Sequence, residues 1–338
     1  MTRSVAVGRA PEPAAPAGWL RELLAVLSPE GARARLSILI FHRVHAERDS
    51  LFPEEMHAAS FRERMFWIRH WFNVLPLEDA VAALRRGTLP ARALAITFDD
   101  GYGDNATVAL PILRELGLHA TFFVATEYLD GGRMWNDTVI ETLRRASGDE
   151  FDATDLGLGT YPIRSLDERR AAIDAIIGQL KYLPTQPRQQ RAEAMAARAC
   201  AALPGQPMMT PAQLRSLAAA GMGFGGHTVT HPILARLDDA AARREIAEGR
   251  ETLEAMIGQP VRLFAYPNGK PRIDYTAAHV RMARELGFIA AVSTAPGAAR
   301  TGGSAYELPR FMPWGRTQVR WVARVVQNLF TSVEAASP

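Results

Sequence analysis

Two adjacent carboxylates, Asp99 and Asp100, follow an uncharged, β-prone run in the sequence LAITFDDGYG. Like charges so close repel each other, and each is costly to bury without a partner. A pair at a strand end therefore predicts a bound cation or a proton to be transferred. The best candidate partners are His227 and His231 in GGHTVTHP, because two imidazoles and one carboxylate are a common ligand set for a catalytic Zn²⁺.

The two aspartates can divide the work at such a metal. Successive residues of a strand point in opposite directions, so Asp100 can face the ion while Asp99 leans over the substrate pocket. Asp99 would then act as general base toward a water activated by the ion. The histidine pair ends a predicted strand, follows two glycines that permit close backbone approach, and is stopped by Pro232, which argues against chance spacing.

The elements that must position these residues alternate between strand and helix, which predicts a parallel sheet covered by helices. With so many units, closure into a barrel is more economical than an open sheet, and function collects at the C-terminal ends of barrel strands. Predicted strands comprise residues 36–44, 73–77, 94–100, 119–126, 222–229, 262–268 and 288–294, with a last short strand near 306–312. Predicted helices comprise residues 60–72, with Ser60 as N-cap, and residues 77–87, 108–117, 238–258 and 276–287.

The alternation breaks between about residues 131 and 215, a polar stretch with predicted helices at 168–183 and 190–203. We interpret this stretch as an insertion that forms a cap or side wall. The predicted organisation is therefore an N-terminal tail with a short helix (1–35), a barrel domain (36–330) that includes the insertion, and a C-terminal tail (331–338).

Composition excludes several classes of protein. The 39 basic and 36 acidic residues are too balanced for a nucleic-acid-binding surface. The single cysteine, Cys200, excludes an internal disulfide and a cysteine-based metal cluster. No apolar run approaches the ~20 residues of a membrane span, and the N-terminus lacks a secretory signal pattern. We therefore expect a cytoplasmic protein without a transmembrane segment. The short amphipathic segment WLRELLAVL leaves peripheral membrane association open, and nothing indicates the oligomeric state.

Three motifs, TFDDGY, HTVTHP and FAYPNG, carry a family resemblance. The chain resembles the polysaccharide deacetylases of the NodB-homology type, carbohydrate esterase family four, over about residues 36–315 apart from the insertion. The resemblance implies a distorted (β/α)7 barrel with Asp99 as catalytic base. It also implies that Asp100, His227 and His231 hold a divalent metal, with Zn²⁺ expected first and Co²⁺ or Ni²⁺ as alternatives.

The sequence departs from the family pattern at two points. Ala265 stands where the third motif commonly has an arginine, and we expect Arg310, near another strand end, to replace it. No late leucine-x-histidine motif follows residue 279 to supply the catalytic acid. His42, in the dipeptide Phe41-His42, resembles the Tyr-His acid of the circularly permuted branch typified by deacetylases of poly-β-1,6-N-acetylglucosamine. We therefore expect His42 to be the general acid.

The resemblance implies hydrolysis of N-acetyl groups on amino sugars in a polysaccharide or glycan precursor, as in exopolysaccharide biosynthesis. A backbone N–H near Asn268 or Tyr266 would bind the oxyanion, and Thr228 would support the histidine loop. The partner is then an acetylated glycan or oligosaccharide and not a nucleic acid. Three alternatives stay open: an O-acetyl esterase or a small-substrate amidase on the same site, or an inactive barrel that binds glycan or protein.

Overall fold

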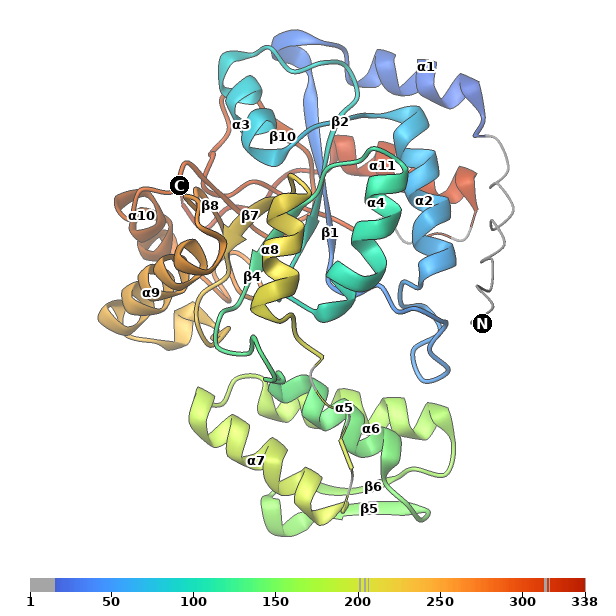
Figure 1. The fold of residues 1–338 in the computed structure, drawn as a ribbon, viewed down its shortest axis with the longest axis vertical. Coiled ribbons are helices and arrows are strands. Elements are labelled where there is room, and N and C mark those ends of the chain that lie inside the picture. The colour runs from blue at the N-terminus through green and yellow to red at the C-terminus, as the bar shows by residue number, and fades with distance from the viewer. Residues whose placement is uncertain are drawn as a thin grey trace, which may run out of the picture.

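A curled sheet of mainly parallel strands forms the larger of two lobes in the computed structural model (Figure 1). The structure describes residues 16–200, 202–203, 205, 207–312, 315 and 317–337, so residues 1–15 of the predicted N-terminal tail lie outside it. The strands are β1 (Arg35–Phe41), β2 (Asn73–Val74), β3 (Ala93–Phe98), β4 (Thr121–Val124), β7 (Gly223–Gly226), β8 (Leu263–Ala265), β9 (Ala290–Val292) and β10 (Ala299–Arg300). Their order is β10-β1-β3-β4-β7-β8-β9, with β2 beside β3.

Residues 308–311 close the sheet into a barrel. On one side Leu308 forms a parallel bridge with Val292 of β9, and on the other side Phe311 forms one with Leu39 of β1. This segment lies where a last short strand is predicted, but it makes isolated bridges, while β10 pairs antiparallel with the start of β1. The predicted class, a distorted (β/α)7 barrel, is confirmed.

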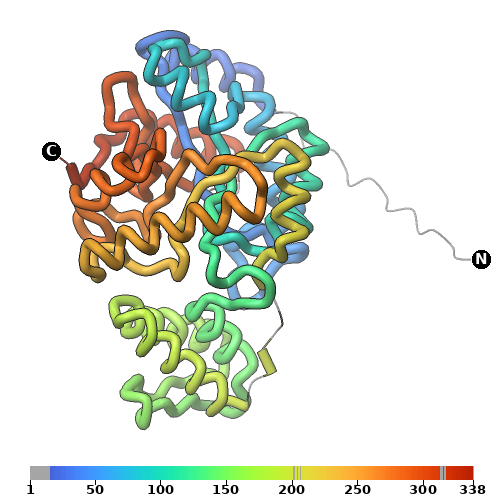
Figure 2. The backbone as a smooth tube through the Cα atoms, turned by 60° about the vertical axis from the view of Figure 1, so that its left-hand side comes forward, coloured from blue at the N-terminus to red at the C-terminus, as the bar shows by residue number. Residues whose placement is uncertain are grey.

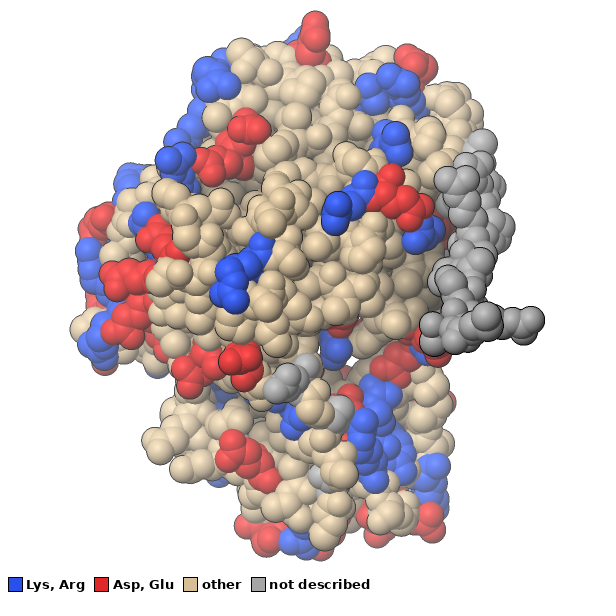
Figure 3. All heavy atoms as spheres, in the orientation of Figure 1, with Lys and Arg blue, Asp and Glu red and all other residues tan. Residues whose placement is uncertain are grey.

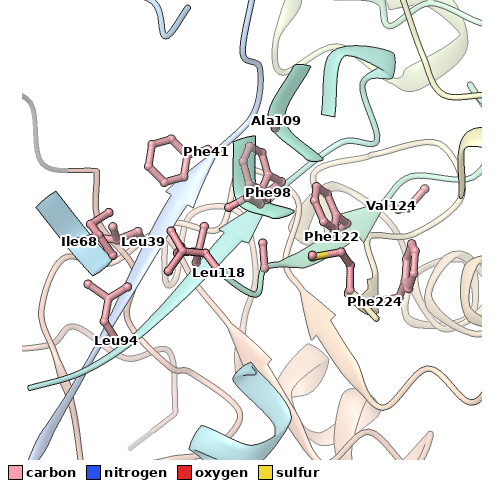
Figure 4. Close-up of a cluster of buried hydrophobic side chains, with 14 of the residues drawn as sticks. Leu39, Phe41, Ile68, Leu94, Phe98, Ala109, Leu118, Phe122, Val124 and Phe224 are labelled. Carbon is pink, nitrogen blue, oxygen red and sulfur yellow. The ribbon is translucent and has the colours of Figure 1, made fainter. Parts of the chain in front are cut away.

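The alternation of side chains along the strands separates the inside of the barrel from its helical cover. In β3, Leu94, Ile96 and Phe98 point outward and pack in the cluster shown in Figure 4, where Phe98 stacks on Phe122 of β4 with ring centroids 5.0 Å apart. Ala93 and Ala95 belong to a separate inner cluster. Because the side-chain period of a strand is two, the inward row of β3 continues toward Asp99.

Helices pack around this sheet. They are α1 (Gly18–Leu27), α2 (Ala58–Trp71), α3 (Leu77–Arg86), α4 (Leu110–Glu115), α8 (Pro211–Ala219), α9 (Asp239–Ile257), α10 (Ala277–Glu285) and α11 (Gln318–Phe330). α3 packs its buried face against the inner cluster, at the opposite end of the sheet from the second lobe (Figure 1). One predicted boundary is wrong: α2 begins before Ser60, with His57 as N-cap, and the Ser60 side chain accepts a hydrogen bond from the His57 backbone N–H.

The second lobe, which we call the insertion lobe, comprises α5 (Trp135–Arg145), β5 (Glu150–Ala153), β6 (Gly159–Pro162), α6 (Leu166–Leu180) and α7 (Thr185–Arg198). It leaves the barrel after β4 and returns at α8, so it hangs from the C-terminal ends of the strands (Figures 1 and 2). Its own core includes Val139, Ile173 and Met195. The prediction of two helices is incomplete, because α5 is polar in sequence and the β5–β6 hairpin is too short to give a clear period.

Candidate active site

Asp99 and Arg310 form a fully buried ion pair at the C-terminal end of β3. The Arg310 guanidinium donates to both carboxylate oxygens of Asp99, at 2.6 and 2.7 Å. It also donates to the Thr97 hydroxyl at 3.2 Å and to the Ser293 carbonyl at 3.0 Å. The segment that closes the barrel thus places Arg310 against the aspartate. Arg310 is the residue that we expected to replace the missing arginine of the third motif.

This ion pair keeps Asp99 ionised. Burial alone would raise the pKa of Asp99, but the charge of Arg310, the charge of His227 and the hydrogen bonds from Arg310 together hold the pKa below its usual value. A carboxylate that is ionised at neutral pH, fixed in one orientation and placed at a strand end can accept a proton from a water molecule.

Asp100 reaches the same region by a turn and not by strand alternation. β3 ends at Phe98, and Asp100 has a φ of 76°, in the left-handed region that non-glycine residues seldom adopt. The expectation that alternation along a strand separates the two carboxylates is therefore wrong. Both carboxylates approach one imidazole: His227 Nε2 lies 3.9 Å from Asp99 Oδ2 and 3.5 Å from Asp100 Oδ1.

Asp100, His227 and His231 form a compact cluster of three metal-ligating side chains. Their ligand atoms all lie within 4.8 Å of one another, and Asp100 Oδ1 is 3.4 Å from His231 Nε2. Tetrahedral bonds of about 2.1 Å to a zinc ion place donor atoms roughly 3.4 Å apart. Asp100 Oδ1 is buried and has no hydrogen-bond partner among the residues that the structure describes, which fits an oxygen that binds a cation.

A hydrogen bond to the backbone fixes the orientation of the His227 ring. Its Nδ1 contacts the Ala265 carbonyl oxygen at 2.8 Å. A carbonyl oxygen can only accept, so Nδ1 carries a proton, and in the neutral imidazole Nε2 has its lone pair available to the cluster. Metal-binding histidines are commonly oriented in this way, so the three residues fit a divalent cation.

The loop between the two histidines is held by Thr228 and by α9. The Thr228 hydroxyl donates to the His227 carbonyl at 2.5 Å and accepts from the His231 backbone N–H at 3.1 Å. The Glu245 carboxylate accepts from the backbone N–H groups of Val229 and Thr230 at 2.9 and 2.8 Å. Glu245 was missed from the sequence, because a glutamate inside an amphipathic helix has no local signal for such a role.

Close approach of α9 to this loop depends on a glycine. A Cβ atom added to Gly249 would lie 2.6 Å from the backbone of Thr228, a distance that real Cβ atoms do not reach. Gly225 has a similar role in β7, where a Cβ atom would meet the Phe123 ring at 2.2 Å. The two glycines before the histidine motif therefore differ from the expectation of close backbone approach: Gly225 makes room mainly for a neighbouring ring, and a Cβ atom at Gly226 would meet only ordinary contacts at 3.7 Å or more.

Backbone strain gathers at this end of the barrel. Asp100, Thr228, His231 and Asn268 all have positive φ, and they are half of the eight such non-glycine residues in the described chain. Each such conformation costs on the order of 1–3 kcal/mol and persists only where the surroundings enforce it. The four residues belong to three different loops, so the strain is a property of the site as a whole and does not come from a single turn.

The structure places His42, Asn268 and Tyr266 differently with respect to this cluster. His42 directly follows β1, is exposed, and its charge contributes to lowering the pKa of Asp99. Asn268 is half-buried, and no described residue accepts a hydrogen bond from its backbone N–H. The Tyr266 backbone N–H instead donates to the Val292 carbonyl at 3.2 Å, so it is not free to bind an oxyanion.

A polar contact beside the site joins the insertion lobe to the barrel. Asp137 of α5 accepts a hydrogen bond from the Tyr102 hydroxyl at 3.1 Å, and the Arg43 guanidinium lies 4.7 Å from the centre of the Tyr102 ring. Burial raises the pKa of Asp137 to about 6, although the charge of Arg43 opposes this rise. This contact has no local signal in the sequence, because its residues come from three separate segments, two loops and α5.

Solved structures with the same fold include known deacetylases. The deacetylase PplD of Streptococcus pyogenes, solved in complex with acetate, has a TM-score of 0.58 and 19% identity, covering 88% of this chain and 99% of that one. IcaB from Ammonifex degensii has a TM-score of 0.57 and 18% identity, covering 89% of this chain and 97% of that one. These likenesses show the fold that this chain shares with both proteins.

Sequence comparisons identify the family. The family model described as polysaccharide deacetylase matches residues 86–155 and 161–291, more than half of the chain. YxkH of Bacillus subtilis (strain 168), whose name marks it provisionally as a polysaccharide deacetylase, is 22% identical over 279 residues, which cover 82% of this chain and 71% of YxkH. The chain belongs to the polysaccharide deacetylase family, as its motifs predicted, and is a hydrolase of that class. In the part of the chain that the structure describes, no helix is both long and apolar enough to cross a membrane.

Proposed function

We propose that this protein is a metal-dependent deacetylase that removes N-acetyl groups from amino sugars of a polysaccharide or glycan precursor. The observation that carries the proposal is the contact between two assemblies: the carboxylate of Asp99, locked by Arg310, lies beside the three-ligand cluster of Asp100, His227 and His231. A base and a cation site are thus arranged around one small space at the strand ends.

The residues have separate roles in this proposal. Asp100, His227 and His231 hold the cation, and the two imidazole nitrogens with one carboxylate favour Zn²⁺, with Co²⁺ or Ni²⁺ as alternatives. A divalent cation bound there supplies Lewis-acid chemistry, which polarises a carbonyl group and acidifies water. Arg310 is a positioning residue that keeps Asp99 ionised and aimed at the site.

Hydrolysis of the amide then needs a base, an oxyanion donor and an acid. Asp99 removes a proton from the attacking water as its oxygen bonds to the acetyl carbon. The backbone N–H of Asn268 donates to the oxyanion that forms, a role that requires no particular side chain. Protonated His42 gives its proton to the sugar nitrogen as the C–N bond breaks, which releases acetate and a free amino group. An amine anion cannot leave unaided, so the amide substrate explains the acid.

Acetate release from N-acetylglucosamine oligomers tests the proposal. Protein stripped of metal should release no acetate, and reloading with Zn²⁺, Co²⁺ or Ni²⁺ should restore release. Asp99→Asn and His42→Ala should each lower kcat by about 10²–10⁴ while metal binding is retained, because each removes a proton-transfer group. Exposed residues of the same types, as in Asp174→Asn and His70→Ala, serve as controls and should behave like wild type.

Other outcomes would redirect the proposal. Loss in Asp99→Asn with full activity in His42→Ala would retain the base and refute the acid. Faster release from O-acetyl esters than from N-acetyl amides, with no dependence on His42, would favour an esterase. Failure to bind any of the three metals would contradict the proposed site.

A further inference from the structure

Exposed apolar side chains concentrate on two neighbouring helices, α1 and α11. The described part of the chain exposes nine large hydrophobic side chains, and five of them belong to these two helices. Single exposed apolar residues are normal on a protein surface, whereas a group of them marks a site of interaction. We call this group the α1–α11 surface; it comprises Trp19 (62% exposed), Leu23 (39%), Val26 (77%), Val319 (64%) and Phe330 (55%).

The apolar arc of α1 is wider than its packing on the barrel requires. Leu20 and Leu24 are buried in the main hydrophobic core. Successive residues of a helix are about 100° apart, so Trp19, Leu23 and Val26 form a second stripe directly beside the buried one. A surface helix that only packed on the barrel would carry polar residues in that second stripe. Half of the apolar arc of α1 thus faces solvent.

α11 carries a stripe of the same kind. Its residues Val319, Ala323, Val326 and Phe330 recur at intervals of three or four, which places them on one face of the helix. Of these four side chains only that of Val326 is half-buried, and the others are exposed. The buried face of α11, which includes Trp321, packs in the main hydrophobic core.

The two helices lie side by side and run in the same direction (Figure 1). Where they begin, the Ala17 backbone N–H donates to the Gln318 side chain at 3.4 Å. Where they end, the Ser28 hydroxyl accepts from the Arg35 backbone N–H at 3.0 Å, and the Arg35 guanidinium lies 4.7 Å from the centre of the Phe330 ring. The side of α11 that carries Phe330 is therefore turned toward α1, so the two stripes form one surface.

Basic side chains flank the α1–α11 surface. Arg320 and Arg324 are exposed on α11, and the 13 residues of this helix include no acidic residue. On α1 the exposed Arg21 and Glu22 balance each other. The face of the protein drawn in Figure 3 differs from α11, because its basic and acidic side chains lie next to each other in mixed groups. The excess of positive charge beside an apolar stripe favours a partner that is both apolar and anionic.

We propose that the α1–α11 surface binds the surface of a membrane that contains anionic lipids. The apolar side chains enter the boundary between headgroups and acyl chains, where a tryptophan ring is favoured, and Arg320 and Arg324 contact anionic headgroups. A second copy of the chain fits less well, because a symmetric dimer places the same surface on both sides and brings together arginines for which α11 offers no acidic partner. α1 lies at the end of the barrel lobe away from the insertion lobe, so a bound membrane leaves the candidate active site open (Figure 1).

Sedimentation of the full chain with lipid vesicles tests the proposal. Wild type should bind vesicles of equal parts phosphatidylglycerol and phosphatidylcholine more tightly than vesicles of phosphatidylcholine alone, and added salt should weaken this binding. In Val26→Gln/Val319→Gln, which places good helix formers at exposed positions, binding to the mixed vesicles should fall about tenfold. The matched control Leu166→Gln/Ile273→Gln changes two exposed apolar residues outside the surface and should bind like wild type.

The arginines have a separate readout. Arg320→Gln/Arg324→Gln should weaken binding to the mixed vesicles about tenfold and leave binding to phosphatidylcholine alone unchanged, since each arginine contributes only where anionic headgroups are present. Arg215→Gln/Arg281→Gln, which changes exposed arginines of α8 and α10, should match wild type on both kinds of vesicle. The far-ultraviolet circular dichroism of all four variants should equal that of wild type, because every substituted side chain is exposed.

Three results would overturn the proposal. The first is binding of wild type to neither kind of vesicle, and the second is equal binding of wild type and Val26→Gln/Val319→Gln to the mixed vesicles. The third comes from sedimentation velocity without lipid: a wild-type dimer that dissociates in Val26→Gln/Val319→Gln, together with no vesicle binding, would assign the surface to a second copy of the chain.

Discussion

The barrel rim and the insertion lobe are stabilised in different ways. The rim contains a buried ion pair, a cluster of three metal-ligating side chains and four non-glycine residues with positive φ. The insertion lobe has an apolar core with residues such as Val139 and Ile176, and most of its ion pairs lie at the surface. The difference indicates that the rim keeps groups that reduce the stability of the fold because its chemistry needs them, while the lobe is a stably packed unit beside it.

Two ion pairs allow this comparison to be tested directly. Asp99 and Arg310 have side chains that are 3% and 0% exposed, and the arginine bonds to both carboxylate oxygens. Arg144 of the insertion lobe makes the same two-bond contact with Asp49, which lies between β1 and α2, but these side chains are 25% and 11% exposed. Burial is therefore the main variable that separates the two pairs.

The largest effect is expected for Arg310→Met. It leaves Asp99 buried without its partner, so the free energy of unfolding should fall by about 3–5 kcal/mol. Arg144→Met, the matched change in the insertion lobe, should cost roughly 1 kcal/mol or less, since solvent screens that pair. Urea denaturation of both variants measures the difference. Equal losses of unfolding free energy in the two variants would show that burial does not distinguish the Asp99–Arg310 pair from the Asp49–Arg144 pair.

The contact between the two lobes predicts a dependence on pH. Burial raises the pKa of Asp137 to about 6, so the stability from its neutral form is present below pH ~4 and is lost as the pH rises through about 6. The amide introduced by Asp137→Asn does not ionise. The stability of this variant relative to wild type should therefore increase between pH 4 and 7, by up to about 3 kcal/mol.

Thermal or urea denaturation at both pH values checks this prediction. Asp174→Asn, at an exposed position of α6, controls for a change of carboxylate to amide in the same lobe. A constant difference between Asp137→Asn and wild type across this range would mean that Asp137 ionises freely at the contact.

The same substitution in two helices should have opposite effects. Gly249→Ala in α9 places a Cβ atom against the backbone of Thr228, so it should destabilise the protein by about 1–3 kcal/mol and lower kcat/KM by shifting the histidine loop. Gly178→Ala in α6 meets no atom within 4 Å and should stabilise by about 0.5–1 kcal/mol. Denaturation curves of the two variants measure both signs, and a stabilising Gly249→Ala would refute the tight packing of α9 on the loop.

Much of the site could be predicted from the sequence, because its motifs are local. Asp99 and Asp100 are adjacent, and His227 and His231 lie four residues apart, so each pair is brought to a strand end by its own segment. The three predicted metal ligands do lie together. Their roles, and the role of His42, stay predictions.

The rest depends on contacts between distant segments. Arg310 was expected near the site, but its two-bond contact with Asp99, across 211 positions of sequence, exists because residues 308–311 close the barrel. Glu245, which holds the histidine loop from α9, was not expected. The positive φ of Asp100, which turns its carboxylate to the same imidazole as Asp99, also departs from the alternation of a strand.

The sequence by itself determined the barrel class, through the alternation of strand and helix, and the main chemical groups of the site, through its local motifs. The tertiary structure alone decided how Arg310 contacts the base, which helix supports the histidine loop, and how Asp100 turns toward His227. These features arise from packing between segments far apart in the chain, and neither side-chain periodicity nor local spacing encodes such contacts.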